Sequence, residues 1–470
     1  MKPSTEQLQA LLAELSDLSP ILDDKQVTRL SKDFAWFSPV LKAALEHYKA
    51  DVGFRPKTEA EIVRIVAACA KHKVPIIARG TGTGNYGQVT PLFGGVILDL
   101  SAYNQMVWQR GAVARVQAGI RLLDINRATI PNGFELRCVP STFRIATAGG
   151  LYGGGFGGIG SINYGPLAST GNVLGVRAIT VEAEPKLVEL RSPEALLLHH
   201  VYGTNGIVLE LELALAPTHV WREAILLTDD MEQALRMADE IANAPGVTKK
   251  SVTYFQSSIQ PYLPMFHDRW AAGKHAVFVV YAEQAKQAID EIAGRHNAAI
   301  TYDEDHQQQL DKIKTILEFT WNHTTLHALR VDDTLTYIQS GFTPGKHIEQ
   351  ALNMHQLLGD ECMLHLEFIR LKEGGMTYSG LQLIKYSDAP RLNDIMQIHR
   401  DNGVYIANPH VYHVEDGKQG VVNPDVVMTK MRFDPLGLLN PGKLRGWEMR
   451  DQIAADVKAG KVNVSTLPKF

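Results

Sequence analysis

Apolar residues recur every three or four positions between residues 59 and 73, which predicts an amphipathic helix. Thr58 and Glu61 have the spacing of a capping box at its start, and Lys73 marks its end. Short apolar runs predict strands at 74–78, 94–100, 111–118, 173–182 and 207–215. A helical pattern falls at 119–130, and not every pair of strands has a helix between its members. This order favours an α+β fold over a doubly wound parallel sheet.

The pattern changes after Pro217, where strands and helices follow each other in a repeating order. The predicted strands are 222–228, 250–256, 276–281 and 298–302, and the predicted helices are 231–242 and 284–293. Two successive β-α-β units in this order indicate a ferredoxin-like lobe. The other predicted elements are two helices within 1–50, helices at 309–319, 345–358 and 390–402, and a strand at 363–371.

The composition is that of a folded globular protein, with 470 residues of which 45% are hydrophobic and 21% are charged. At ~100–200 residues per domain, this length predicts two to four domains. A net charge of −4 offers no basic excess for phosphates, so no nucleic-acid partner is expected. The sequence shows neither a membrane span nor the basic start and apolar core of a secretion signal.

The cysteines Cys69, Cys138 and Cys362 are widely spaced and odd in number. They predict neither a disulfide framework nor a cysteine-based zinc site. We therefore expect a reducing compartment and a cytoplasmic location for the protein.

Residues 82–87 match the spacing GxGxxG, which is found at Rossmann dinucleotide sites. The context excludes such a site, because Gln88 and the residues after it lead to a strand and not to a helix. A phosphate at this loop would have to be held by backbone amides, which closely spaced glycines allow to converge. Arg79 could add positive charge beside the loop. The alternative interpretation is a plain surface turn.

Glycine is concentrated a second time, at eight of the twelve residues 149–160. A run with so few side chains cannot build a core of its own, so we expect its backbone to pack against a flat ligand. A disordered glycine linker is the alternative. The aromatic and isoleucine residues within the run, and its structured flanks, argue against that alternative.

Three separated motifs resemble those of the vanillyl-alcohol oxidase / p-cresol methylhydroxylase superfamily of FAD-dependent oxidoreductases. They are residues 79–84, residues 146–150 together with Gly157 and Gly158, and residues 434–443. Each motif is modest alone, and their order and separation make the set specific. The resemblance covers most of 50–217 and 430–445. It implies an α+β fold, with a two-subdomain PCMH-type FAD-binding domain and a ferredoxin-like substrate (cap) domain.

The resemblance also implies a division of the chain and a set of cofactor contacts. The division is an N-terminal helical segment (1–45), an FAD-binding PCMH-type domain (46–217), a substrate or cap domain (218–424) and a C-terminal segment (425–470) that returns to the FAD domain. The residues implied to contact FAD are Arg79, Gly80, Thr81, Gly82, Thr83, Gly84, Pro140, Ser141, Ala146, Thr147, Gly149, Gly150, Gly157, Ile207 and Asn440. Some relatives attach FAD through a histidine in the first glycine loop. Thr83 stands at that position here, so non-covalent FAD is expected.

Oxidation of an alcohol at a flavin needs a base for the hydroxyl proton, and histidine suits that role near neutral pH. His410, Tyr412 and His413 form one candidate cluster of catalytic or substrate-contacting residues. His410 and His413 could instead bind a metal together with a distant carboxylate such as Glu367, or the cluster could be structural. Because the ligand set is incomplete in the sequence, we predict no metal.

His323 belongs to a second candidate cluster, at residues 321–327, which is expected to line the pocket over the flavin. Arg330 follows closely, and Arg330 or Arg370 could hold a substrate carboxylate through two parallel hydrogen bonds. For each arginine alone, a solvent-facing role is the alternative. Tyr378 is a weaker pocket candidate.

The leading hypothesis is an FAD-dependent oxidase or dehydrogenase that transfers a hydride from a small 2-hydroxy acid or alcohol to flavin N5. The alternatives are oxidation of a phenolic or benzylic alcohol, and a non-catalytic flavin-binding subunit. A small-molecule substrate and an electron acceptor, either O2 or a redox partner, are implied. A homodimer is the oligomeric state that we consider for this protein.

Overall fold

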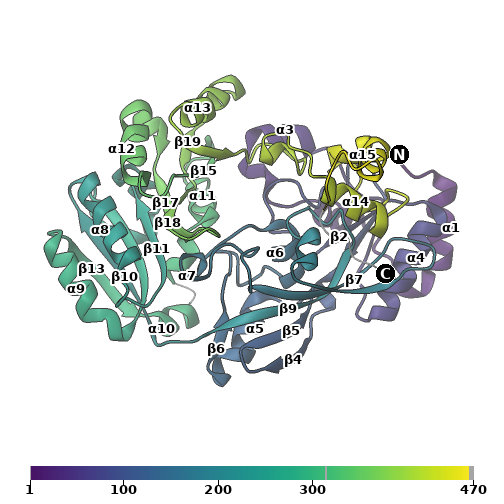
Figure 1. Ribbon diagram of the computed structural model, residues 1–470, viewed down its shortest axis with the longest axis horizontal. Coiled ribbons are helices and arrows are strands. Elements are labelled where there is room, and N and C mark those ends of the chain that lie inside the picture. The colour runs from purple at the N-terminus through teal and green to yellow at the C-terminus, as the bar shows by residue number, and fades with distance from the viewer. Residues whose placement is uncertain (1, 313–314, 465–470) are drawn as a thin grey trace.

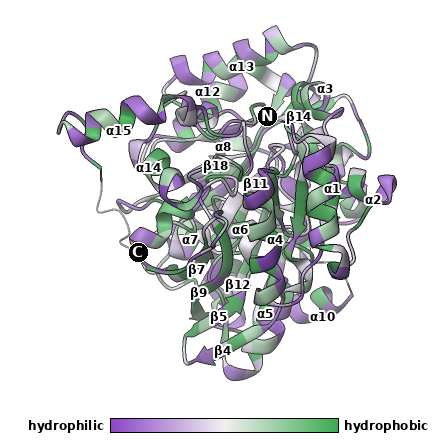
Figure 2. Cartoon of the chain, turned by 90° about the vertical axis from the view of Figure 1, so that its right-hand side faces the viewer, coloured by the Kyte–Doolittle hydropathy of each residue, from purple (hydrophilic) through white to green (hydrophobic). Residues whose placement is uncertain are grey.

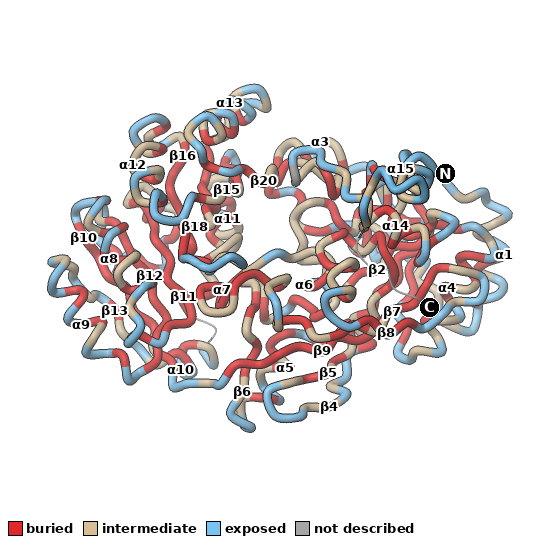
Figure 3. The backbone as a smooth tube through the Cα atoms, in the orientation of Figure 1, coloured by how far each residue is buried: buried red, intermediate tan, exposed pale blue. Residues whose placement is uncertain are grey.

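The computed structural model describes residues 2–312 and 315–464 of the chain. It shows two lobes side by side (Figure 1). The first lobe holds the N-terminal and the C-terminal helices. The second, called the cap lobe below, begins at β10 (Trp221–Thr228) and includes α13 (Ala389–Asp401). The strands of both lobes are largely buried, and exposed positions concentrate on outer helices and turns (Figure 3).

The first lobe begins with helices around a small parallel sheet. The helices are α1 (Thr5–Glu14), α2 (Asp24–Leu30), α3 (Pro39–Leu45) and α4 (Glu59–His72). The sheet has the order β1 (Val52–Phe54), β3 (Val96–Asp99), β2 (Ile76–Arg79). Thr58 and Glu61 form the predicted capping box, and Lys73 ends α4 in the left-handed conformation with φ 56°. The predicted limits of this helix are therefore confirmed, whereas the described residues 2–50 contain three α-helices and not two.

The other strands of the first lobe form an antiparallel sheet in the order β4-β5-β9-β7-β8, with β6 paired to another part of β9. They are β4 (Met106–Arg110), β5 (Val113–Gln117), β6 (Phe134–Leu136), β7 (Val173–Ile179), β8 (Leu187–Arg191) and β9 (Ile207–Pro217). The apolar runs predict the central strands β5, β7 and β9 correctly. The edge strands β4 and β8 were missed, because edge strands expose alternate residues and carry few consecutive apolar ones. The helix α5 (Leu122–Thr129) confirms the helical pattern at 119–130.

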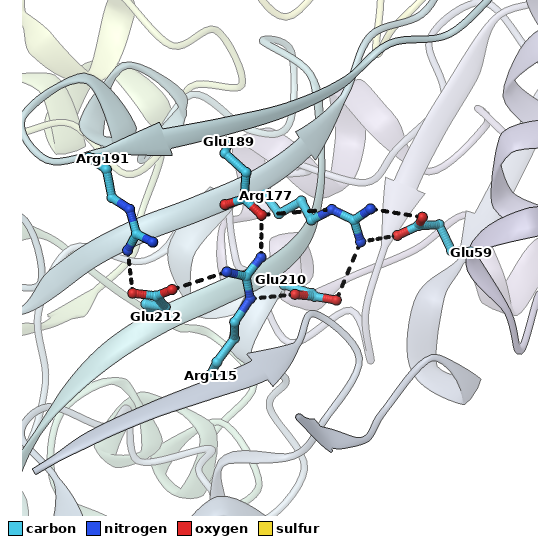
Figure 4. A network of polar contacts seen from close by, with 7 residues as sticks. All are labelled: Glu59, Arg115, Arg177, Glu189, Arg191, Glu210 and Glu212. Carbon is cyan, nitrogen blue, oxygen red and sulfur yellow. Dashed lines mark hydrogen bonds and ion pairs between the residues drawn. The ribbon is translucent and has the colours of Figure 1, made fainter. Parts of the chain in front are cut away.

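A ladder of charged side chains crosses one face of this antiparallel sheet (Figure 4). Arg115 on β5 lies opposite Glu212 on β9, with 3.0 Å between Nη1 and Oε1, and its Nε lies 2.5 Å from Oε2 of Glu210. Arg177 on β7 continues the ladder to Glu59 of α4, with 2.9 Å between Nη2 and Oε1. Glu210 and Glu212 are each only 8% exposed, and the pair of Arg177 with Glu59 joins this ladder to α4.

The cap lobe is built on an eight-stranded sheet in the order β13-β10-β12-β11-β17-β18-β15-β20. The first four strands are antiparallel neighbours, and along the chain they follow the order β10-α8-β11-β12-α9-β13 of a ferredoxin-like unit. Besides β10, this unit comprises the strands β11 (Lys249–Phe255), β12 (His275–Ala282) and β13 (Ala299–Asp305). Its helices are α8 (Met231–Asn243) and α9 (Lys286–Arg295). The predicted ferredoxin-like lobe is therefore confirmed.

Four further strands extend this sheet toward the first lobe. They are β15 (Gln339–Gly341), β17 (His365–Arg370), β18 (Met376–Gly380) and β20 (Tyr405–Ala407). A small second sheet comprises β14 (Leu335–Tyr337), β16 (Cys362–Met363) and β19 (Leu383–Lys385). The pattern at 363–371 predicted β17 alone, because the other strands are too short to show an alternation.

The two faces of the cap sheet have different surroundings. Leu366, Phe368 and Tyr378 pack with residues of α8 and of α12 (His347–Leu358) in one apolar cluster. Glu367 and Ile369 alternate with them along β17 and face the opposite side. Hydrophobic residues concentrate in the interior strands, and the outer helices carry many hydrophilic residues (Figure 2). The face that carries Glu367 also carries apolar residues such as Phe255 and Phe278, which belong to one core cluster with residues of the first lobe.

One helix predicted in the cap lobe is wrong. The stretch 309–319 contains the end of α10 (His306–Asp311) and a separate 3-10 turn at Ile316–Phe319, and residues 313–314 lie outside the described residues. Buried Glu223 accepts a hydrogen bond from the amide of Ile316, where this turn begins.

The C-terminal segment returns to the first lobe. After α14 (Pro424–Phe433), Leu439 pairs in parallel with Ile76 of β2, and α15 (Arg450–Lys458) packs on α14. The chain changes sheet between Pro217 and Trp221. We therefore propose to retain the predicted division into 1–45, 46–217, 218–424 and 425–470. No helix of the described part of the chain is long and apolar enough to span a bilayer.

A candidate cofactor and substrate cavity

A cavity of about 510 Å³ lies where the two lobes meet. This volume is within the range of about 300–1,000 Å³ that is usual for cofactor and ligand sites. Its wall combines the first glycine loop, the second glycine-rich segment and the extended part of the cap sheet. Segments that are far apart in the sequence therefore share one site.

Most of the predicted cofactor contacts lie on the wall of this cavity. They are Arg79, Gly80, Thr81, Gly82, Thr83, Gly84, Pro140, Ser141, Ala146, Thr147, Gly149, Gly150 and Gly157. Ile207 and Asn440 are not among the lining residues, although Gly206 and Val208 on either side of Ile207 are. Ile207 instead packs in the apolar core beneath the parallel sheet. The geometry is compatible with the predicted FAD contacts at the first thirteen positions.

Neighbouring side chains lie so close to the first glycine loop that a side chain does not fit at two of its positions. A Cβ atom at Gly80 would lie 2.0 Å from Oγ1 of Thr147. Gly82 has φ +69°, and a Cβ there would lie 2.3 Å from the guanidinium of Arg79. The absence of side chains lets the two glycine segments meet and leaves a cradle of bare backbone facing the cavity.

Arg79 supports this loop from behind. Its guanidinium donates to the carbonyl oxygens of Leu30, Lys32 (2.8 Å) and Thr81 (3.0 Å). Burial lowers the pKa of Arg79, and nearby carboxylates oppose that effect. The side chain therefore orders the loop through these three hydrogen bonds, and it also contributes to the cavity wall.

The second glycine-rich segment is helical, which the sequence did not predict. Thr147 caps α6 (Ala148–Gly154) by accepting a hydrogen bond from the amide of Gly150 (3.3 Å). Leu151 and Tyr152 are buried in the core, while Gly149, Gly150, Gly153 and Gly154 line the cavity. Two large side chains on one face thus anchor a helix whose other face is almost bare.

The third motif, residues 434–443, supports the first glycine loop from outside the cavity. The side-chain amide of Asn440 donates to the carbonyl oxygens of Gln88 (2.8 Å) and Tyr202 (2.7 Å), and the ammonium of Lys443 donates to that of Gly87 (2.7 Å). Burial lowers the pKa of Lys443 to about 7, against the opposing charge of Asp33. Asn440 therefore supports the end of the first glycine loop and does not itself line the cavity.

Two side chains of the first glycine loop connect it to the cap. Tyr86 donates its hydroxyl to Oε1 of Gln339 (2.6 Å), and Nδ2 of Asn85 donates to the hydroxyl of Tyr337 (2.5 Å). Burial raises the pKa of Tyr86 to about 12, so this hydroxyl stays protonated and continues to donate. The same loop that forms the cradle thus fixes the position of the cap above it.

The structure does not bring the His410 cluster to the cavity wall. His410 is 5% exposed, and its Nε2 donates to the carbonyl of Tyr337 while Nδ1 accepts from the hydroxyl of Ser38, each at 2.8 Å. Tyr412 packs beside Lys443, and His413 pairs with Asp416 at 3.2 Å. The sequence pattern could not separate these roles, because a buried histidine that joins two segments has the same neighbours in sequence as a catalytic one.

The second histidine cluster is divided by the structure. His323 lines the cavity together with Trp321 and Asn322, whereas Arg330 is exposed and does not line it. Nδ1 of His323 donates to the carbonyl of Glu318 (3.1 Å), which leaves Nε2 as the acceptor. Burial lowers the pKa of His323 to about 4, so the ring is neutral at neutral pH.

The remaining candidates have structural surroundings. Glu367 contacts His365 and Thr253 and is not near the His410 cluster in any contact of the described residues. Among those residues, no three His, Cys, Asp or Glu side chains are arranged to hold a metal. Tyr378 reaches the cavity on β18, although its ring packs against His347 of α12 at 4.7 Å.

The sequence also missed several lining residues. Phe34 and Phe37 come from the N-terminal segment, with their rings stacked 5.5 Å apart. Thr377 and Ser379 come from β18, and Tyr405 from β20. No short-range signal marks them, because they reach the site only through pairing between distant segments.

We expect replacement of His410 by leucine to lower stability and to leave flavin chemistry intact. The substitution deprives the carbonyl of Tyr337 and the hydroxyl of Ser38 of a partner, and each unsatisfied buried group costs about 1–3 kcal/mol. Denaturant unfolding should report a loss of about 2–4 kcal/mol, with flavin content unchanged. A large loss of flavin reduction rate in a variant with native stability would show that His410 takes part in the reaction.

The same histidine makes stability depend on pH. Burial lowers the pKa of His410 to about 4, below its unfolded value, so the unfolded chain takes up the proton first as the pH falls. The contribution of His410 to the free energy of unfolding is fully present above about pH 6.5 and declines toward pH 4. At pH 5 the loss from this one group is about 2 kcal/mol. Unfolding at pH 7 and pH 5 should show a smaller decline in His410→Leu than in the native protein.

Comparison with known proteins indicates which cofactor the cradle of glycine backbone binds. Residues 50–190 match the family model described as an FAD binding domain. Residues 50–190 are therefore similar to FAD-binding domains, in keeping with the resemblance to the vanillyl-alcohol oxidase / p-cresol methylhydroxylase superfamily that the glycine motifs indicate. The matched range contains both glycine segments, which form the cradle on the first lobe. The cofactor is therefore FAD, and its non-covalent attachment stays a prediction.

One curated relative and two solved structures show how far this FAD-binding chain resembles known proteins. The glycolate oxidase subunit GlcD of Bacillus subtilis (strain 168) is 29% identical over 204 residues, which are 41% of this chain and 43% of that protein. The chain thus matches less than half the length of that relative. A structure of alkyldihydroxyacetonephosphate synthase has a TM-score of 0.70 at 15% identity, covering 94% of this chain and 86% of that one. The 4-ethylphenol oxidase of Gulosibacter chungangensis in its isoeugenol complex has a TM-score of 0.64 at 15% identity, covering 94% and 97%. The two structures share the fold of both lobes.

Proposed function

We propose that the protein oxidises a small hydroxylated substrate, a 2-hydroxy acid or an alcohol, with FAD as the acceptor of a hydride at flavin N5. The single observation that carries the proposal is the shared cavity, in which the glycine cradle of the first lobe faces polar and apolar side chains of the cap. Bound FAD supplies the two-electron redox chemistry that no protein side chain provides. The cap supplies the side chains that hold and orient the substrate.

His323 is the side chain that we propose to receive the substrate hydroxyl. Its neutral ring, with the proton on Nδ1, offers Nε2 as a hydrogen-bond acceptor on the cavity wall. A hydroxyl that donates to this nitrogen is oriented and can lose its proton as the hydride leaves the carbon. Arg330 has no proposed role at the substrate, because it is exposed and outside the wall.

The relatives and the cavity support different substrate classes. The similarity to a glycolate oxidase subunit favours a 2-hydroxy acid. The aromatic and aliphatic part of the wall, which includes Phe34, Phe37, Phe342 and Ile369, favours a benzylic or phenolic alcohol as the second candidate. The electron acceptor, O2 or a redox partner, is common to both proposals.

The test is an anaerobic screen of the purified holoprotein against glycolate, D-lactate, benzyl alcohol and 4-hydroxybenzyl alcohol. We expect at least one compound to bleach the oxidised flavin absorption with saturation kinetics. A yellow protein whose flavin none of the four compounds reduces would contradict the proposed reaction. A protein that binds no FAD would contradict the cofactor assignment as well.

A further inference from the structure

We propose that the cavity selects an uncharged substrate, an alcohol recognised by amide and hydroxyl groups, and discriminates against the carboxylate of a 2-hydroxy acid. The inference deepens the proposed function and rests on it for the class of reaction. Three observations carry it: the kinds of side chain that the cap places on the cavity wall, the positions of the cations around the cavity, and the effect of these surroundings on the charge of His323.

The cap contributes uncharged side chains to the cavity wall. Its polar members carry hydroxyl, amide or imidazole groups and include Asn322, Gln339, Ser379 and Asn408. Among the described residues of the cap, no lysine, arginine, aspartate or glutamate lines the cavity. Hydroxyl and amide groups form hydrogen bonds with a neutral hydroxyl, ether or amide, but they do not balance the charge of a carboxylate.

Two amide side chains of this wall have a donor left for a ligand. Oε1 of Gln339 accepts from the hydroxyl of Tyr86 (2.6 Å), and Oδ1 of Asn408 accepts from the amide of His410 (2.9 Å). Both side chains belong to partly exposed residues, and neither amide nitrogen is a buried atom without a partner in the described part of the chain. Each carboxamide is therefore fixed at its oxygen and can donate from its nitrogen to a neutral oxygen atom of a substrate.

The charged side chain on the wall belongs to the first lobe. Within residues 2–312 and 315–464, Arg79 is the one lysine, arginine, aspartate or glutamate that lines the cavity. Its guanidinium donates to the carbonyl oxygens of Leu30, Lys32 and Thr81. Arg79 is thus engaged beneath the first glycine loop, on the cofactor side of the cavity, and supplies no counter-charge to the cap side.

Three further arginines adjoin the cavity without lining it. Arg144 is paired with Glu318, with 2.6 Å between Nε and Oε1. Arg330 and Arg370, the candidates for binding a substrate carboxylate, are exposed and lie outside the wall. Water and ions screen exposed charges, so neither arginine balances a charge that is buried in the cavity.

His323 shows how the cavity wall affects a charge. Burial lowers the pKa of His323 to about 4, with a smaller contribution from Arg330. The ring is therefore uncharged at neutral pH and offers a carboxylate no opposite charge. The same desolvation acts on a carboxylate that enters the cavity, because an ion leaves water unfavourably unless an opposite charge replaces that water. A ligand without charge is therefore favoured beside His323.

The decisive comparison uses pairs of ligands that have nearly the same shape and differ in charge. The pairs are pyruvamide with pyruvate and benzoylformamide with benzoylformate. These ketones carry no hydrogen on the carbonyl carbon, so the flavin stays oxidised. The oxidised holoprotein is titrated with each compound, and the flavin absorption spectrum reports binding. We expect at least one amide to bind, and the Kd of its carboxylate partner to be at least about 10-fold higher.

Two results would overturn the inference: a carboxylate that binds as tightly as its amide partner, or no binding of any of the four compounds. Its failure is distinguishable from that of the proposed reaction. If the amides are preferred while no screened alcohol reduces the flavin, the reaction fails and the charge selectivity stands. If glycolate or D-lactate reduces the flavin and the carboxylates bind more tightly than the amides, the reaction stands and the charge selectivity fails.

Two variants at Tyr405 test directly whether charge at the wall governs the choice of ligand. Tyr405 lines the cavity from β20 and is 48% exposed, so its replacement should not disturb the fold. Tyr405→Lys adds an ammonium group to the cap side, and Tyr405→Gln is its uncharged counterpart. We expect the ratio of carboxylate Kd to amide Kd to be about 3- to 10-fold lower in the lysine variant, and this difference to shrink in about 1 M NaCl. Equal ratios in the two variants would contradict the inference.

Arg330→Gln is the control for a cation outside the wall. It should change neither the ratio of the two Kd values nor the FAD Kd, because Arg330 is exposed and does not line the cavity. A rise in the carboxylate Kd without a rise in the amide Kd would show that Arg330 reaches the ligand, and the inference would be wrong.

Discussion

Replacement of Gly80 by valine is expected to abolish FAD binding while leaving the fold in place. The Cβ atom alone would lie 2.0 Å from Oγ1 and 3.1 Å from Cβ of Thr147, so the first glycine loop must move away from α6. That movement opens the cradle that both segments form on the cavity wall. A displacement of about 1 Å is enough to break backbone hydrogen bonds to a ligand, so we expect the FAD Kd to rise at least about 100-fold. The ratio of flavin to protein absorbance after purification measures the effect.

Gly246→Val is the control, because Gly246 is exposed and a Cβ there meets no atom within 4 Å. It should purify with the native flavin content. Gly80→Ala combined with Thr147→Ala should recover part of the binding that Gly80→Ala loses, since the colliding hydroxyl is gone. Full flavin content in Gly80→Val would show that the contact between the two segments is not needed for the cofactor.

The sequence predicted those parts of the fold whose signals are local. The capping box at Thr58 and the left-handed end at Lys73 are properties of a few neighbouring residues, and both ends of α4 are as predicted. The repeated strand–helix order after Pro217 likewise indicated the ferredoxin-like part of the cap. The glycine loops were recognised because a shortage of side chains can be seen directly in the sequence.

The missed features depend on contacts between distant segments. The extension of the cap sheet by β15, β18 and β20 uses strands of five residues or fewer, and their pairing cannot be seen in the local pattern. Phe34 reaches the cavity because its amide donates to the carbonyl of Gly84, about 50 residues away. His410 was a candidate because histidine suits the role of a base, and its two buried hydrogen-bond partners, which lie far away in the sequence, could not be seen in the local pattern.

Replacement of Lys430 by methionine is expected to cost about 3–5 kcal/mol in the free energy of unfolding, as is usual when one partner of a buried ion pair is removed. Nζ of Lys430 lies 2.8 Å from Oδ2 of Asp434, and the two side chains are 2% and 0% exposed. Lys430 also donates to the carbonyl oxygens of Thr204 (3.1 Å) and Leu439 (3.0 Å). Burial lowers the pKa of Lys430, while Asp434 opposes that shift and keeps the pair together. The methionine fills the space of the lysine but leaves a carboxylate buried without its counter-charge.

The pair acts on the cofactor site through the C-terminal segment. Asp434 accepts from the amides of Leu438 (2.9 Å) and Leu439 (2.8 Å), and Leu439 pairs with β2, which leads into the first glycine loop. Loosening of this segment should therefore weaken FAD binding in addition to stability, because Asn440 holds that loop from behind.

Arg236→Met provides the comparison for the Lys430 variant, because Arg236 forms an ion pair with Glu232 at the same four-residue spacing on an exposed helix surface. It should cost less than about 1 kcal/mol. Adding Asp434→Asn to Lys430→Met removes the uncompensated charge and should restore part of the lost stability. If Lys430→Met lowers the free energy of unfolding no more than Arg236→Met does, then water reaches Asp434. In that case the Lys430–Asp434 pair does not behave as a buried ion pair. The double variant separates that outcome from a simple loss of packing, since only an uncompensated charge can be relieved by a second, neutralising substitution.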